Sequence, residues 1–400
     1  MKAKGFTRFM QLVFPIALCA IPAAYANTEG DEPNGKFETI ALFSGTGAPS
    51  LPEAGLVQGV DGNFYGTSYY GGANNFGTVY SVTANGVVTV LHSFAGGSDG
   101  EGPAAALIMG SDGALYGTTV WGGSGPCTNS QGNGCGTVFR ITPDGTESIV
   151  YSFQSGGDGY APTTGVIQVA NGDLYGATNG GGIYNSGTIF HITAAGVESI
   201  IHTYNYGVDG GAPSGLVQGL DGNIYGLDGY FFGAVFRLTL TGDFTILYSF
   251  GANPNDAAFP NGMLTMDSNG NLYGTASSGG TSGFGAIFEV TPGGMERIVY
   301  SFTNGQDGGT PNGTVYIGSD GLLYGTTQYG GAHGHGTVYQ INENGSERTL
   351  HSFANCSYTS VGGTGFALIA DNGDALYGAT TGNCGAIDGS GGVFRLKANQ

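Results

Sequence analysis

Residues 215–226 read GLVQGLDGNIYG: a short apolar stretch, an Asp-Gly turn and a second stretch that ends in Tyr-Gly. Asp-Gly and Asn-Gly favour tight type I′ turns, so this segment predicts two antiparallel strands joined by a two-residue hairpin turn. The pattern recurs about every 50 residues, which is typical of repeat architectures. The Tyr-Gly pairs begin at Tyr65, Tyr116, Tyr175, Tyr225, Tyr273, Tyr324 and Tyr377.

Each repeat contains two further strands, so that the four strands can be named A to D in chain order. A glycine-rich loop and a strand such as 136–139 follow Tyr-Gly, and another turn leads to a strand such as 89–94. Strands A, B and C occur seven times, whereas D occurs six times after C and once alone at 37–43. We therefore predict an all-β, seven-bladed β-propeller of four-stranded antiparallel blades, in which the N-terminal strand completes the last blade.

The N-terminal segment has the pattern of a secretory signal peptide. Lys2, Lys4 and Arg8 precede an apolar stretch, and small residues surround Ala26, where we expect cleavage. The predicted organisation is a signal peptide at 1–26, a linker at 27–36 and one propeller domain at 37–397. We expect a secreted protein, extracellular or periplasmic, with no transmembrane segment in the mature chain.

The composition excludes several classes of protein. The chain has 80 glycines among 400 residues, but 40% of its residues are hydrophobic and the glycines have no three-residue period, which excludes disorder and collagen. The net charge is −19, and removal of three basic residues with the signal peptide would make it −22. Such a surface repels nucleic acid. We expect a monomer.

Four cysteines remain outside the predicted signal peptide, and they allow three pairings in an oxidising compartment. Cys127 and Cys135 lie in one B–C loop, so a bond between them would brace that loop. Cys356 and Cys384 lie in two loops that the blade topology brings to the same face. We predict the disulfides Cys127–Cys135 and Cys356–Cys384.

The repeat can be written GLVQGxDGNxYGT…GG…GTVYxITxxG…xxLHSFxxGxDGxxP. Over roughly residues 37–396 it resembles the GloVer tandem repeat of exported bacterial proteins. More distantly, residues 215–226 are similar to the first two strands of NHL-type propeller blades. The resemblance implies an exported propeller and brings no established activity with it.

The D–A and B–C loops emerge on one face of a propeller, and aromatic residues interrupt the glycines of the B–C loops. Flat exposed rings stack on sugars or on protein partners, which makes these residues candidates for ligand binding. The alternative is packing over the blade edge. The candidates are Tyr70, Trp121, Tyr184, Tyr230 and Tyr329, with Phe231, Phe232 and Phe284 nearby.

Acidic and histidine residues on the same face are candidates for a metal site. Five aspartates, each four residues before a proline, could surround a calcium ion, or each could cap its own Asp-Gly turn. They are Asp99, Asp158, Asp209, Asp256 and Asp307. His333 and His335 form a His-Gly-His pair that has the spacing to share a metal, or that is simply solvated.

A further position alternates between His and Tyr in strand D, and we predict that these side chains donate hydrogen bonds to a neighbouring loop rather than take part in catalysis. The residues are His92, Tyr151, His202, Tyr248, Tyr300 and His351.

No nucleophile motif or pair of distinct carboxylates stands out from the repeat. The sequence therefore favours a binding or scaffold module that engages an extracellular glycan or protein through the D–A/B–C loop face. The alternative is a secreted propeller enzyme, a polysaccharide lyase or hydrolase, with acidic residues at the channel mouth. A purely structural exported protein remains a third class. A quinone-dependent dehydrogenase fits less well, because the chain has one tryptophan.

Overall fold

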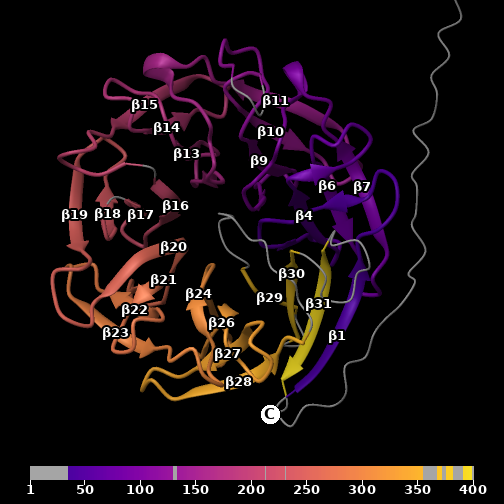
Figure 1. Ribbon diagram of the computed structural model, residues 1–400. Helices are drawn as coiled ribbons and strands as arrows, with labels where there is room; N and C mark the ends of the chain where they lie inside the picture. Colours follow the sequence, from indigo (N-terminus) through magenta and orange to yellow (C-terminus); the bar gives the residue numbers. More distant parts are fainter. Residues whose placement is uncertain are drawn as a thin grey trace, which may run out of the picture.

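The computed structural model describes residues 35–128, 133–211, 213–229, 231–354, 367–371, 375–381 and 391–398. Seven four-stranded antiparallel sheets of these residues form a closed ring, with the A strands inside and the D strands at the periphery (Figure 1). The predicted seven-bladed propeller is confirmed. Among the described residues, no helix is long and apolar enough to cross a membrane.

The strands of the first three blades follow the predicted order A to D. Blade 1 contains β3 (Val57–Gln58), β4 (Phe64–Ser68), β6 (Thr78–Val82) and β7 (Val88–Ser93). Blade 2 contains β8 (Ile108–Met109), β9 (Leu115–Thr119), β10 (Thr137–Ile141) and β11 (Glu147–Ser152). Blade 3 contains β12 (Ile167–Gln168), β13 (Leu174–Thr178), β14 (Thr188–Ile192) and β15 (Glu198–Thr203).

Blades 4 to 6 repeat this order; the A strand is longer in blades 4 and 5 and is divided into two short strands in blade 6. Blade 4 contains β16 (Pro213–Gln218), β17 (Ile224–Asp228), β18 (Ala234–Leu238) and β19 (Phe244–Ser249). Blade 5 contains β20 (Ala257–Met266), β21 (Leu272–Gly279), β22 (Ala286–Val290) and β23 (Glu296–Ser301). Blade 6 contains β24 (Gly309–Pro311), β25 (Tyr316–Ile317), β26 (Leu323–Tyr329), β27 (Thr337–Ile341) and β28 (Glu347–Ser352). Outside the blades, β2 (Pro49–Ser50) pairs with β5 (Tyr70–Gly71).

Blade 7 closes the ring by combining both ends of the described chain. It contains β29 (Ile369–Ala370), β30 (Leu376–Thr380), β31 (Gly392–Ala398) and the N-terminal β1 (Gly35–Leu42). Strand β1 pairs antiparallel with β31, and Phe37 lies opposite Leu396. Arg395 forms an ion pair with Glu38 across this ladder at 2.5 Å. The predicted closure by the N-terminal strand is therefore confirmed.

The hairpin turns differ from the type I′ prediction. In the A–B turn of blade 1, the Gly62 N–H donates to the Gly59 carbonyl at 3.0 Å, and Gly62 has a φ of +80°. Asp61 is not left-handed, so the hairpin contains a type I turn followed by a left-handed glycine. Asp61 stabilises the turn instead by accepting the Asn63 N–H at 3.1 Å.

The glycine of each Tyr-Gly pair leaves room for an aromatic ring. Gly117 lies opposite Phe139 in the ladder between β9 and β10, and Gly176 lies opposite Phe190 in blade 3. A Cβ atom on Gly117 would lie 2.6 Å from the Phe139 ring. Glycine is required because the buried ring of strand C lies directly over strand B.

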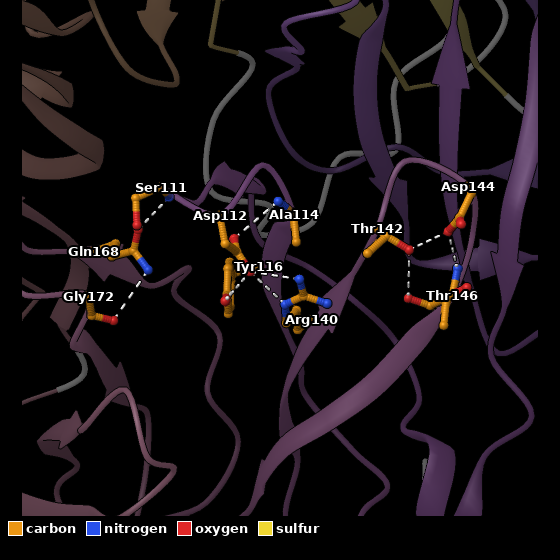
Figure 2. Close-up of polar contacts among 10 residues, drawn as sticks. All are labelled: Ser111, Asp112, Ala114, Tyr116, Arg140, Thr142, Asp144, Thr146, Gln168 and Gly172. Atoms are coloured by element: carbon orange, nitrogen blue, oxygen red, sulfur yellow. Dashed lines mark hydrogen bonds and ion pairs between the residues drawn. The ribbon is translucent and has the colours of Figure 1, made fainter.

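The tyrosine of the pair packs between blades, as predicted, and it also binds the A–B turn. Figure 2 shows this contact in blade 2, where the Tyr116 hydroxyl donates to Asp112 at 3.2 Å. Arg140 forms an ion pair with the same carboxylate at 2.7 Å. Between neighbouring blades, the Ser111 N–H donates to the Gln168 side chain at 2.7 Å (Figure 2).

The core consists of apolar layers between adjacent blades. One layer joins Tyr65 and Phe94 of blade 1 to Leu107 and Phe139 of blade 2. At the centre, the A strands of blades 2 to 5 line a hollow of about 540 Å³, whose walls include Ile108, Ile167 and Met263. The buried aromatic residues therefore stabilise the contacts between adjacent blades.

Candidate functional site

The D–A and B–C loops meet on one face of the ring. The Ala161 N–H, in the segment that enters blade 3, donates to the Cys135 carbonyl in the B–C loop of blade 2 at 2.9 Å. The Phe259 N–H makes the equivalent bond to the Phe232 carbonyl at 2.9 Å. These D–A segments therefore lie against the B–C loops of the preceding blades, and the two kinds of loop form shared surface sites.

The structure exposes most of the predicted aromatic residues. The exposed fractions are 47% for Tyr70, 56% for Tyr184 and 44% for Tyr329. Phe231, Phe232 and Phe284 are exposed on the same loops. Trp121 is half-buried, and Tyr230 lies outside the described residues.

Trp121 belongs to a group at the junction of blades 1 and 2, which we call the acidic–aromatic corner. Its members are Glu53, Tyr69, Tyr70, Glu101 and Trp121. Tyr69 connects the members of the group, because the charges of both glutamates add to the burial that raises the pKa of its hydroxyl. The Trp121 indole N–H is shielded from solvent and has no hydrogen-bond partner among the described residues, and the Trp121 side chain lowers the pKa of Tyr69. The Tyr69 and Tyr70 rings lie 4.8 Å apart, edge to face.

Backbone pairing holds the corner in place. Glu101 and Trp121 exchange two N–H···O bonds of 2.9 and 3.0 Å, which join the D–A segment to the B–C loop of blade 2. Ser50 pairs with Tyr70 through the short β2–β5 ladder. The Tyr69 ring covers Gly102, which has a φ of +64°, and a Cβ atom there would lie 3.0 Å from the ring. The corner is therefore built on paired backbone and not on free loops.

The two glutamates of the corner are poorly solvated. Burial raises the pKa of Glu53 to about 7 and raises the pKa of Glu101 above its usual range. Burial also raises the pKa of Tyr69, while the Trp121 indole lowers it in part. At neutral pH, a substantial fraction of Glu53 is protonated, so this carboxyl group both donates and accepts hydrogen bonds.

The corner breaks the symmetry of the repeat, which the sequence analysis missed. The positions equivalent to Glu53 in blades 2 to 6 hold Ala104, Thr163, Ser214, Asn261 and Asn312. Those equivalent to Tyr69 hold Val120, Asn179, Gly229, Ser277 and Gln328. Both positions vary from blade to blade, so a comparison of aligned repeats does not single out Glu53 or Tyr69.

The five candidate calcium ligands make the contacts of the turn-capping alternative. Asp158 accepts hydrogen bonds from the Tyr151 hydroxyl at 2.8 Å and from the Gln154 N–H. Asp209 accepts the Asn205 N–H at 2.7 Å and lies 3.2 Å from the His202 imidazole. The same pattern occurs at Asp99, Asp256 and Asp307. These carboxylates therefore stabilise their own loops.

These contacts also confirm the predicted role of strand D, because its His or Tyr residues bond to the D–A segment. His351 is fully buried and stacks on Phe37 at 3.8 Å, and most of the D–A segment that follows it lies outside the described residues. Burial lowers its pKa to about 4, and the nearby His333 adds to the effect.

Within the described ranges, one group of three residues has the geometry to hold a metal ion, and it consists of His92, Asp99 and Glu147. It contains neither His333 nor His335. Of the two predicted disulfides, Cys127–Cys135 is present and braces the B–C loop of blade 2. Cys356 and Cys384 lie outside the described residues.

The sequence and the fold both have known relatives. Residues 29–231 and 228–400 match the Gloeobacter/Verrucomicrobia repeat family, which confirms the resemblance found in the repeat. Among curated proteins, none matches the chain.

Several solved propellers share the fold. Virginiamycin B lyase from Staphylococcus aureus superposes with a TM-score of 0.58 at 15% identity, covering 91% of this chain and 99% of the lyase. The extracellular domain of a protein from B. thetaiotaomicron, described as a hybrid two-component system, superposes with a TM-score of 0.58 at 12% identity, covering 92% of this chain and 40% of that one. A protein from Bacteroides uniformis, described as a 6-phosphogluconolactonase, has a TM-score of 0.50 at 18% identity, covering 79% and 90%. At these identities the likeness establishes the fold alone.

Proposed function

The chain belongs to the Gloeobacter/Verrucomicrobia repeat family, and from its own geometry we propose that it is an exported module that binds a neutral glycan at the acidic–aromatic corner. The observation that carries the proposal is the Tyr69 hydroxyl, whose pKa is influenced by the poorly solvated carboxyl groups of Glu53 and Glu101 and by the Trp121 side chain. Blades 2 to 6 have no Glu at the position of Glu53 and no Tyr at the position of Tyr69.

The chemistry of the corner suits a sugar. Aromatic rings pack on the apolar faces of pyranose rings, and Tyr70 offers an exposed ring beside Tyr69. Carboxyl groups bind hydroxyl groups, and Glu53 does so with reduced charge because burial raises its pKa to about 7. The chain's net charge of −19 disfavours an anionic polysaccharide. A neutral glycan fits both the corner and its surroundings.

The other blades supply matched replacements that test the proposal. Glu53→Ala introduces the residue of blade 2 at this position, and Tyr69→Val does the same. Because both replacements occur in a blade of the same fold, we expect folded variants. Binding of neutral oligosaccharides is measured by calorimetry and by the fluorescence of Trp121, the one tryptophan of the chain.

We expect each corner variant to bind at least about tenfold more weakly than the wild type, the loss of one good contact. Tyr329→Ala, on blade 6 of the same face, is the matched control and leaves the affinity unchanged. If neutral oligosaccharides cause neither heat nor a fluorescence change, or if Tyr329→Ala abolishes binding and the corner variants do not, the corner is not the binding site.

A secreted hydrolase or lyase is the second candidate. The observation in its favour is that Glu53 and Glu101 lie near one hydroxyl in different environments, since only Glu53 reaches a pKa of about 7. A pair of carboxyl groups of unequal pKa is what glycoside hydrolysis requires. Release of new reducing ends from a polysaccharide, abolished by Glu53→Gln with binding retained, would establish this function.

A further inference from the structure

A separate repeated feature lies at the seams between the outer strands of adjacent blades. The first residue of a D strand faces the preceding blade, where it meets the His or Tyr of strand D and the Asp of the D–A segment. At four seams this first residue is glutamate. The groups are Glu147, Asp99 and His92; Glu198, Asp158 and Tyr151; Glu296, Asp256 and Tyr248; and Glu347, Asp307 and Tyr300. We call each Glu with its Asp a seam carboxyl pair.

The seam between blades 1 and 2 shows how close these groups lie. The His92 imidazole lies 3.1 Å from the Asp99 carboxylate. The facing atoms of His92, Asp99 and Glu147 all lie within 4.8 Å of one another. Two carboxyl groups from different blades are therefore in near contact.

The next seam shows the same arrangement with tyrosine in place of histidine. The Tyr151 hydroxyl donates to Asp158 at 2.8 Å. Across the seam, Asp158 adds to the burial that raises the pKa of Glu198. Since a neutral tyrosine replaces histidine here, the pair does not depend on an imidazole.

Several oxygen atoms of these pairs lack a donor. Among the described residues, one oxygen each of Glu147, Glu198 and Glu296 is shielded from solvent without a hydrogen-bond partner. Asp256, opposite Glu296, is 8% exposed and has a shielded oxygen of the same kind. Two poorly solvated carboxylates side by side repel each other. A proton shared between them removes the repulsion and supplies the hydrogen-bond donor that their shielded oxygens lack.

The groups around each glutamate support proton binding. Burial, and then the facing Asp, raises the pKa of Glu198 and of Glu296 to about 7. Glu347 also has a pKa of about 7, which burial and Asp307 raise and Thr349 lowers in part. Burial raises the pKa of Glu147, and Asp99 adds to this while His92 opposes it.

Within their own blades, the four glutamates lie opposite apolar residues of strand C, and the Thr349 hydroxyl donates to Glu347 at 2.9 Å. Residues opposite them on strand C are Ile141, Ile192, Val290 and Ile341. Arg297 and Arg348 follow Glu296 and Glu347 directly, so they point to the opposite strand face, where Arg297 pairs with Glu289.

We propose that the four seam carboxyl pairs bind protons as the blades pack together, which makes the propeller a pH-responsive ring that is more stable in mildly acidic than in mildly alkaline solution. Each pair acts between two blades, so loss of its proton weakens blade–blade contact and not the fold within a blade.

The sign of the effect follows from linkage. The unfolded glutamates release their protons near pH 4.5, whereas three of the folded ones release them near pH 7. Folding therefore takes up protons between these values, and the stability that the pairs contribute is lost as the pH rises through about 7. Buried His351 and His202 act in the opposite direction, because burial lowers their pKa values and their contribution is lost as the pH falls below 6.5.

The test compares the intact chain with a variant in which Glu147, Glu198, Glu296 and Glu347 are replaced by Gln. Glutamine keeps the shape and donates permanently to the facing aspartate. Glu343→Gln, an exposed glutamate, is the matched control. Chemical unfolding is followed from about pH 5 to about pH 8, with and without a chelator.

For the wild type and the control, we expect the unfolding equilibrium constant to rise at least about tenfold per pH unit near pH 6. The four-glutamine variant shows a much smaller rise, because Glu53 and Glu101 keep their raised pKa values, and it is more stable than the wild type at pH 8. If this variant does not fold, Glu198→Gln is tested alone. We expect it to lower the number of protons taken up on folding, read from the pH dependence of the unfolding equilibrium constant, by about one.

Parallel pH profiles for the wild type and the variants would overturn the proposal. A cation site at the seams would overturn it too, and it has a different signature. In that case the chelator destabilises the wild type at pH 8, and added calcium or zinc restores its stability, but neither affects the glutamine variants.

Discussion

The seam between blades 4 and 5 and the seam between blades 6 and 7 bring the same strand positions together with opposite chemistry. In the first, Glu296 faces Tyr248 and Asp256. In the second, Phe37 stacks on His351 at a ring distance of 3.8 Å and with an interplanar angle of 5°. The first seam is polar and poorly solvated, whereas the second is apolar and fully packed.

The seam between blades 3 and 4 shows that this difference follows a rule. Phe244 occupies the position of the seam glutamates, and it stacks on His202 at 4.2 Å. Where strand D of one blade has Tyr at the His/Tyr position, the facing residue of the next blade is Glu. Where the facing residue is Phe, the strand D position holds His. The repeated backbone therefore determines which residues meet, and the identity of those residues determines whether proton uptake stabilises or destabilises the seam.

The largest effect is expected at the stacked seam that closes the ring. Phe37→Ala removes a ring that is 3% exposed and contacts His351, Phe353 and Phe394. We expect a loss of about 3–5 kcal/mol in the free energy of unfolding, the usual cost of emptying a buried aromatic site. Urea unfolding measures the loss. Phe37→Leu is the control, which keeps most of the burial and loses less; an equal loss for both would assign the effect to stacking alone.

The same seam has a pH dependence opposite to that of the carboxyl pairs. Because burial lowers the pKa of His351 to about 4, the folded state resists protonation, and stability is lost as the pH falls from 6.5 toward 4. His351→Phe removes this loss, which is on the order of 2 kcal/mol. Unfolding is compared at about pH 7 and pH 4.5. An unchanged acid slope in the variant would mean that other groups cause the acid loss.

The blade pattern could be predicted from the sequence because every copy repeats the same hairpin signals. Tyr-Gly and Asp-Gly recur in phase, so the number of blades and the closure by residues 37–43 followed from counting strands. The bond between Cys127 and Cys135 followed from their place in one loop. Only the turn type was wrong, since Asp61 is not left-handed.

The seams and the corner could not be predicted in this way. Glu198 and Asp158 are 40 residues apart, and nothing local indicates that they face each other. Tyr69, Glu53 and Glu101 occupy positions that vary from blade to blade, and only the packing of blade 1 against blade 2 brings them together. Trp121 was predicted because it is the one tryptophan, but not its half-buried state. Contacts between blades depend on tertiary packing that a single repeat does not encode.

A smaller effect is expected from the hydrogen bonds that support the seam aspartates. Asp256 accepts the Tyr248 hydroxyl at 3.0 Å and one backbone N–H, whereas Asp307 also accepts two bonds from Thr303 besides that of Tyr300. Tyr248→Phe therefore costs about 1–2 kcal/mol and Tyr300→Phe about 0.5–1 kcal/mol. Chemical unfolding at pH 6 measures both. The reverse order would show that the number of remaining donors does not set the cost.

The smallest effect is expected where one polar seam can be converted into another. His92 donates to Asp99 as tyrosine does to aspartate in blades 2, 4 and 5. His92→Tyr keeps a donor at this position, so we expect a change within about 0.5 kcal/mol, whereas His92→Ala leaves Asp99 with the Ala95 N–H and costs about 1–2 kcal/mol. The pair of variants is compared by urea unfolding at pH 6 and pH 8. If His92→Tyr loses as much as His92→Ala, the imidazole does something that tyrosine cannot, and this seam differs in kind from the other three.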